Sequence, residues 1–178
     1  MSQPIPSTDQ LLEFSDHRPW PLPSTPWVMA QSWQYLLFAH WPMPTEAMRV
    51  LVPSALELDT FDGEAWISVV PFKMSDVHPR GLPSVPWLSH FPELNVRTYV
   101  KAGDGSRPGV YFFSLDANFR LAVWAARIGW SLPYRYATMS ACEGPTADGQ
   151  PQSRRYQSER PGGTGRHSVS FRVGERLG

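Results

Sequence analysis

The sequence predicts a mainly β domain with one substantial helix and one short helix. Nineteen prolines divide the 178 residues into segments too short for a helical bundle. Several of these segments alternate apolar and polar residues, which is typical of half-buried strands. One segment, residues 118–130, has the length and the apolar periodicity of a helix. These observations favour many strands and turns over an all-helical fold.

The composition is that of a globular protein. Apolar residues make up 42% of the chain and charged residues 18%, and the length suffices for a buried core. Sixteen basic residues balance sixteen acidic ones, so no net charge favours nucleic acid or an anionic membrane as a partner. Neither a signal peptide nor a membrane-length apolar segment is visible. We therefore expect a soluble, cytoplasmic protein.

The N-terminal part is predicted to be an extended arm. Residues 1–26 are rich in Pro and Ser, and proline favours extended backbone. Trp20 and Trp27 carry large rings that can attach this arm to the body. The remaining residues, 27–178, are predicted to form a single domain.

Two local motifs organise the next segments. Thr45 as N-cap and Pro53 as stop define a short helix over about residues 45–52. The Asp62-Gly63 dipeptide between two alternating segments is a strong hairpin signal. The predicted strands of this part are residues 32–42, 57–61 and 64–72.

A long loop and a second hairpin follow. Residues 73–91 contain many chain breakers and are predicted to form an irregular loop, and such loops are often functional. The segment ELNVRTYV, residues 93–100, alternates as a strand and pairs with residues 110–117. One face of this strand is polar, which indicates either contact with water or a polar pocket. The polar row consists of Glu93, Asn95, Arg97 and Tyr99.

The second half of the chain begins with the best helix. Asn118 can cap it, and Gly129 with Pro133 can end it. The apolar stripe predicted to face the core consists of Leu121, Trp124, Ala125 and Ile128. Three strands are predicted after the helix, within residues 134–143, 154–160 and 167–175.

No motif in the sequence assigns a reaction. Phosphate loops, nucleophile elbows and zinc-protease motifs are missing, and the five histidines lack metal-ligand spacing. We therefore predict no metal and no cofactor, and we interpret His40 as a core or surface histidine. The single cysteine, Cys142, excludes an internal disulfide and is interpreted as a small buried strand residue.

Five segments, taken together, resemble the YqjF-like family of uncharacterised proteins in the acetoacetate decarboxylase-like superfamily. They are FAHWPMP, LVPSALELDTFDGEAWISVVPF, PELNVRTYV, PGVYFFSLDA and LPYRYA, in this order, and the resemblance covers roughly residues 28–173. It implies a closed or partly closed, cone-like antiparallel β-barrel with an internal ligand cavity. In such a barrel alternate side chains point inward, so the polar row, Ser114 and Asp116 would line the cavity.

The family continues beyond the point where this chain ends, at VGERLG. The resemblance therefore implies a domain that lacks the C-terminal end of the family. Two explanations stay open, namely a truncated product or a partner chain, as in a homodimer, that completes the sheet.

The resemblance also bears on chemistry. Acetoacetate decarboxylases form a Schiff base on the first lysine of a Pro-Lys-Lys segment. The corresponding segment here keeps Pro133 but has Tyr134 and Arg135 in place of the lysines. Neither side chain forms an imine at ordinary pH. Lys73 and Lys101 are not positioned to replace them, so we expect no Schiff-base decarboxylation.

The resemblance and the polar row together predict a pocket for a small organic acid or related metabolite. Arg97 and Arg135 would anchor a carboxylate, and Asn95 would line the site. The candidates for acid–base roles are Glu93, Tyr99, Asp116 and Tyr134. An enzyme of this kind would be lyase- or isomerase-like. The alternatives are a non-catalytic sensing or binding module and a structural module in which an internal ion-pair network lines the barrel.

Overall fold

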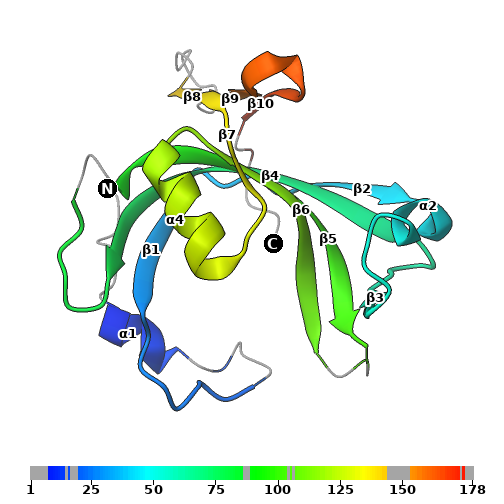
Figure 1. Ribbon diagram of the computed structural model, residues 1–178, viewed down its shortest axis with the longest axis horizontal. Coiled ribbons are helices and arrows are strands. Elements are labelled where there is room, and N and C mark those ends of the chain that lie inside the picture. The colour runs from blue at the N-terminus through cyan, green and yellow to red at the C-terminus, as the bar shows by residue number, and fades with distance from the viewer. Residues whose placement is uncertain are drawn as a thin grey trace.

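The computed structural model describes residues 8–14, 16, 20–85, 89–103, 105, 107–143, 153–172 and 174. Two β-sheets and several short helices make up this part of the chain (Figure 1). The strands of the larger sheet are β1 (Met29–Gln34), β2 (Ala39–Met43), β3 (Leu56–Leu58), β4 (Ala65–Pro79), β5 (Phe91–Ala102), β6 (Pro108–Ala117) and β7 (Tyr134–Tyr136). The smaller sheet contains β8 (Thr138–Glu143), β9 (Ser153–Glu159) and β10 (Arg166–Arg172). The helices are α1 (Thr8–Glu13), α2 (Thr45–Arg49), α4 (Arg120–Trp130) and the 3₁₀ turn η1 (Pro161–Gly163).

The prediction of a mainly β fold is confirmed, but neither described sheet closes into a barrel. The larger sheet has the order β1-β4-β5-β6-β7, with β2 on β4 and β3 on β5, and the smaller one has the order β10-β9-β8. The larger sheet is also mixed, because β7 runs parallel to β6. The crossover through α4 explains this direction, since a helix between two neighbouring strands allows parallel pairing.

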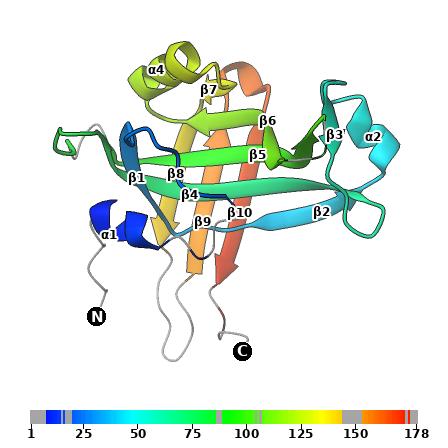
Figure 2. The same ribbon diagram turned by 90° about the horizontal axis from the view of Figure 1, so that it is seen from below.

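The larger sheet is arched, and its two faces have different neighbours (Figures 1 and 2). The face beneath the arch in Figure 1, called the concave face here, is covered by α4 at one end. The core cluster beneath α4 consists of Val70, Phe72, Met74, Phe91, Ala117 and Val123. The smaller sheet crosses the opposite face. A second cluster, in which α2 buries Met48 against Ala65 and Val100, lies near the far end of the arch.

The turn at Asp62-Gly63 is confirmed, but the pairing of its first strand is not. Both residues have positive φ angles, 52° and 79°, and Phe61 and Glu64 form a single β-bridge around them. This is the geometry of the tight hairpin turns that glycine makes possible. However, β3 pairs with β5 instead of β4. The alternation pattern of a three-residue strand is too short to select its neighbour.

Several predicted boundaries are wrong. The strand predicted at residues 32–42 is interrupted at Tyr35, which has a positive φ angle of 56°, so it forms the two strands β1 and β2. The predicted loop at 73–91 is shorter, because β4 continues to Pro79. Thr45 starts the short helix but does not cap it. Its hydroxyl instead donates a hydrogen bond to the carbonyl of Gly63.

The helix at 118–130 is confirmed, whereas three of the four residues of its predicted buried stripe are exposed to solvent, and the side chain of the fourth, Ala125, lies outside the described part. Trp124 is 61% exposed, and Leu121 and Ile128 are also more than half exposed. The helix packs instead through Val123, with Phe119 as its N-cap residue in place of Asn118. It ends at Ser131, whose left-handed conformation replaces the predicted end at Gly129. The stripe had the correct period but the wrong phase.

Two further expectations need correction. Cys142 is exposed on β8, because it lies on the outer side of the smaller sheet. The predicted extended arm contains α1, although Trp27 does contact the body through the edge of His78 and the guanidinium of Arg80.

No helix in the described ranges is long and apolar enough to cross a membrane.

Candidate functional site

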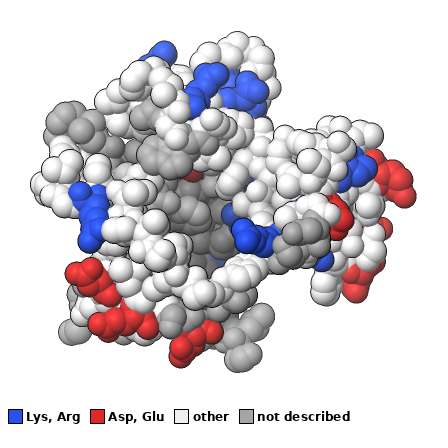
Figure 3. Space-filling model, turned by 60° about the horizontal axis from the view of Figure 1, so that its bottom comes forward, with Lys and Arg blue, Asp and Glu red and all other residues white. Residues whose placement is uncertain are grey.

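The polar row of β5 faces the concave side of the larger sheet. Glu93 lies opposite Phe72 of β4, and Phe72 belongs to the core beneath α4, so both side chains point to this face. Glu93 and Asn95 are only 1% exposed, while Arg97 and Tyr99 are half-buried. The row is therefore not a solvated strand face. Figure 3, in which this side comes forward, shows a hollow with basic side chains at its margin.

Glu93 forms a buried pair with Tyr134. The Tyr134 hydroxyl lies 3.1 Å from both carboxylate oxygens and donates to them. Strand β7 positions this tyrosine by pairing Tyr134 with Leu115 of β6. Burial raises the pKa of Glu93 to about 7, and hydrogen bonds from Tyr134 and Asn95 offset part of the rise. Glu93 can therefore gain or lose a proton near neutral pH.

Tyr134 remains protonated in this pair. Burial raises its pKa well above the ordinary value, and the charge of Glu93 raises it further. A less acidic phenol is a poorer general acid, so the geometry favours Tyr134 as a hydrogen-bond donor that holds Glu93.

Three buried polar atoms further along the concave face have no hydrogen-bond partner. They are Ser68 Oγ, Asn95 Oδ1 and Arg97 Nε. Ser68 of β4 lies directly opposite Arg97, so two of these groups are neighbours in the sheet. A buried polar group without a partner destabilises a fold by about 1–3 kcal/mol. These three atoms could therefore form hydrogen bonds with a polar ligand.

Two residues that sequence reasoning missed adjoin the row. Ser68 is a polar residue on the side of the strand that otherwise carries the apolar Val70 and Phe72. This exception to the apolar pattern could have indicated a buried polar position from sequence. His40 of β2 lies opposite Ser68, and its Nε2 forms a 2.6 Å hydrogen bond with the Tyr99 hydroxyl. No local pattern predicts this second contact, because 59 residues separate the partners.

Ser114 and Asp116 do not join the polar row. The register places Asp116 opposite Leu94, so both residues lie on the other face of the sheet. There Asp116 accepts hydrogen bonds from Arg160 and from Ser158 of β9. Arg160 Nη2 also donates to Ser114 Oγ at 2.7 Å. The expectation of one shared cavity is therefore wrong, and these groups link the two sheets.

The structure also separates the two arginines predicted as anchors. Arg135 is exposed, and it points away from Tyr134 because neighbouring residues of a strand face opposite sides. The lysines lie elsewhere. Lys101, eight residues from Glu93 along β5, forms a partly exposed ion pair with Asp59 at 2.8 Å, and Lys73 lines a pocket with Tyr156 on the face that the smaller sheet covers. Neither lysine accompanies Glu93.

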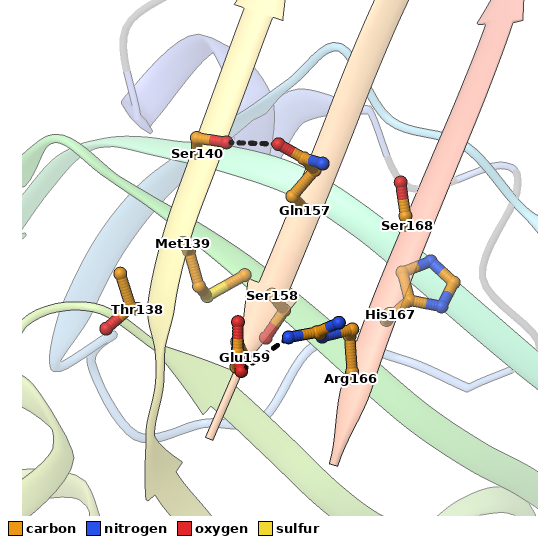
Figure 4. Close-up of a pocket in the computed structure, with 9 residues that line it drawn as sticks. All are labelled: Thr138, Met139, Ser140, Gln157, Ser158, Glu159, Arg166, His167 and Ser168. Carbon is orange, nitrogen blue, oxygen red and sulfur yellow. Dashed lines mark hydrogen bonds and ion pairs between the residues drawn. The ribbon is translucent and has the colours of Figure 1, made fainter. Parts of the chain in front are cut away.

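A separate cavity of about 400 Å³ lies on the smaller sheet (Figure 4). None of the predicted site residues lines it. Its walls are Thr138, Met139, Ser140, Gln157, Ser158, Glu159, Arg166, His167 and Ser168. Burial lowers the pKa of His167, and the charge of Asp116 offsets part of this effect. Among the described residues no group of three His, Cys, Asp or Glu side chains is placed to hold a metal ion.

Sequence comparison connects the chain to proteins of unassigned activity. The family DUF2071, described as an uncharacterized conserved protein, matches residues 30–177. The chain is 52% identical over 120 residues to the uncharacterized protein YqjF of Bacillus subtilis (strain 168). This match covers 67% of the chain and 49% of the relative. The chain thus spans about half the length of the curated relative that it matches.

Structural comparison gives more distant similarities. An acetoacetate decarboxylase from Legionella pneumophila has a TM-score of 0.56 at 12% identity, over 90% of this chain and 56% of that one. The enduracididine biosynthesis enzyme MppR, complexed with pyruvate, has a TM-score of 0.61 at 13% identity, over 85% and 59%. An acetoacetate decarboxylase-like enzyme from Sphingomonas wittichii RW1 has a TM-score of 0.54 at 12% identity, over 71% and 51%. These similarities establish the fold alone.

Proposed function

Because this chain belongs to the DUF2071 family, described as uncharacterized conserved proteins, and has an acetoacetate decarboxylase-like fold, we propose that it binds a small carboxylate on its concave face. Arg97 supplies the charge for the carboxylate. Asn95 and Ser68 supply further hydrogen bonds, and Glu93 adjoins the ligand.

The row of unpartnered buried atoms carries this proposal. Arg97 Nε is a donor, Asn95 Oδ1 is an acceptor and Ser68 Oγ can be either, and all three are buried without partners. A carboxylate pairs with a guanidinium through charge-assisted hydrogen bonds. A hydroxyl or protonated oxygen on the same ligand satisfies the acceptor. A small hydroxy or keto acid therefore matches the arrangement.

Glu93 gives the site its capacity for proton transfer. With a pKa of about 7, it can protonate or deprotonate a bound ligand at neutral pH. Lys101 is eight residues from Glu93 along β5 and forms an ion pair with Asp59, so the proposal contains no imine intermediate. Binding without turnover is the second candidate, and the same residues would serve it.

A thermal-shift series tests the proposal. Small keto, hydroxy and dicarboxylic acids are titrated against the protein, and neutral amides of the same shape are run beside them. The acids that bind should stabilise the fold by about 2–3 kcal/mol at a hundred-fold excess over Kd. The amides should have no effect, because they lack the charge that Arg97 recognises.

Two arginine variants make the test specific. Arg97→Gln should abolish the stabilisation, whereas Arg155→Gln, an exposed site on the smaller sheet, should retain it. Arg97→Lys keeps the positive charge. If this variant still responds to the acids, the loss of stabilisation in Arg97→Gln comes from the missing charge and not from misfolding. The proposal is wrong if no acid stabilises the parent, or if both Gln variants respond like the parent.

A further inference from the structure

Arg97 lies among aromatic rings as well as polar groups. Its guanidinium carbon is 5.3 Å from the ring centroid of Phe38 and 5.9 Å from that of Tyr99. These distances are within the range of cation–π attraction. The carboxylate anchor of the concave face is thus bordered by π-systems.

The rings form a row with nearly parallel planes. The Phe38 and His40 rings are 6.2 Å apart at 19°, and the His40 and Tyr99 rings are 5.8 Å apart at 20°. Phe38 directly precedes β2, His40 belongs to β2, and Tyr99 belongs to β5. The 2.6 Å hydrogen bond between His40 and Tyr99 fixes the orientation of two of the rings. The row is therefore preorganised.

This aromatic row is open to solvent. Phe38 is 48% exposed, and His40 is exposed as well. Aromatic rings in a core bury most of their surface, so a row held rigid but left half exposed does not serve core packing. Its position beside Arg97 matches a ligand with a flat ring at one end and a negative charge at the other.

We infer that the ligand of this site is an aromatic carboxylate. Its carboxylate pairs with Arg97, and its ring lies against the row formed by Phe38, His40 and Tyr99. The inference rests on the proposed function and narrows it, since an aliphatic acid would gain the charge pairing without the ring contact. Offset or edge-to-face ring contact adds to affinity beyond the area that it buries.

Isothermal titration with two matched acids tests the inference. Benzoate and cyclohexanecarboxylate have the same charge and similar size, but only benzoate has a π-system. We expect benzoate to bind about ten-fold more tightly. Phe38→Leu should reduce this preference to below about three-fold while leaving the affinity for cyclohexanecarboxylate unchanged. Trp124→Ser, an exposed aromatic on α4, serves as the control and should keep the full preference.

The outcomes separate the inference from the proposed function. Equal binding of the two acids, abolished by Arg97→Gln, would overturn the aromatic preference and leave carboxylate binding intact. An unchanged preference in Phe38→Leu would also overturn the inference, because the ring contact would lie elsewhere. Binding of neither acid at millimolar concentration would contradict both.

Discussion

The Glu93 carboxyl links the stability of the protein to pH. Its pKa is about 7 in the folded chain and about 4.5 when solvated, so the folded state binds the proton more tightly. Its contribution to stability is therefore present below pH 4.5 and is lost as the pH rises through 7. We predict that the difference in unfolding free energy between the parent and Glu93→Gln changes by about 3 kcal/mol between pH 4.5 and 7.5.

Chemical denaturation of both proteins at several pH values measures this difference. Using the difference removes the effect of other titrating groups, including His167. The pKa of His167 is lowered by burial, so its contribution has the opposite sign and is lost as the pH falls below its ordinary value. Parallel stability curves for the parent and Glu93→Gln would mean that Glu93 is not buried as described.

Tyr134 should tune the acidity of Glu93. Its hydrogen bond favours the charged carboxylate and lowers the pKa of Glu93. We therefore predict that Tyr134→Phe raises the pKa of Glu93 further and destabilises the fold by about 1 kcal/mol. Carboxyl ¹³C chemical shifts across a pH titration measure the first effect. A lower pKa in the variant would show that water reaches Glu93 once the hydroxyl is removed.

Helix α4 supplies a test of packing. Val123 is buried in the core beneath the helix, whereas Trp124 is mostly exposed. We predict that Val123→Ala destabilises the protein by about 2 kcal/mol, because it removes two buried methyl groups. Trp124→Ser should change stability by less than about 0.5 kcal/mol, since surface substitutions rarely matter more. Urea denaturation of both variants checks the prediction, and the reverse order would favour the stripe predicted from sequence.

Asp116 and Arg160 form one of the links between the two sheets. Their side chains are 5% and 21% exposed and form an ion pair at 2.8 Å. We predict that Arg160→Gln destabilises the protein by about 3 kcal/mol, because the buried carboxylate loses its cationic partner and keeps, among the described residues, only the hydrogen bond from Ser158. The exposed Arg155→Gln should have little effect and is the matched control. Equal stability of the two variants in urea denaturation would mean that the pair does not hold the sheets together.

Local sequence patterns predicted the helices, strands and turns better than they predicted which strands pair and which face a side chain occupies. The polar row of β5, the helix at 118–130 and the turn at Asp62-Gly63 follow from residue order within a few positions. The neighbour of β3 and the side on which Asp116 lies depend on strand register, which residues distant in sequence decide. The phase of α4 depends on the surface beneath it. Sequence periodicity contains neither kind of information.

At the scale of the whole molecule, several residues of the candidate site were predictable from sequence, but their partners were not. The pairing of Glu93 with Tyr134 brings together two residues that sequence reasoning named separately, 41 positions apart. Arg135 was named with Arg97, but Arg135 lies opposite Asp116 in the sheet and therefore on the other face. Sequence reasoning did not assign three further residues to the site. The pairing of β2, β4 and β5 brings Ser68 and His40 next to Arg97, together with the neighbouring Phe38.

We propose that Arg97, on the concave face of the arched sheet, binds a carboxylate. The Nε–Hε resonances of arginine in ¹H–¹⁵N spectra report on it directly, and Arg97→Gln identifies the resonance of Arg97 by its loss. We predict that benzoate shifts this resonance saturably, while benzamide, which has the same shape without charge, does not. A benzoate titration that leaves the Arg97 resonance in place, whether or not other arginines respond, would contradict it.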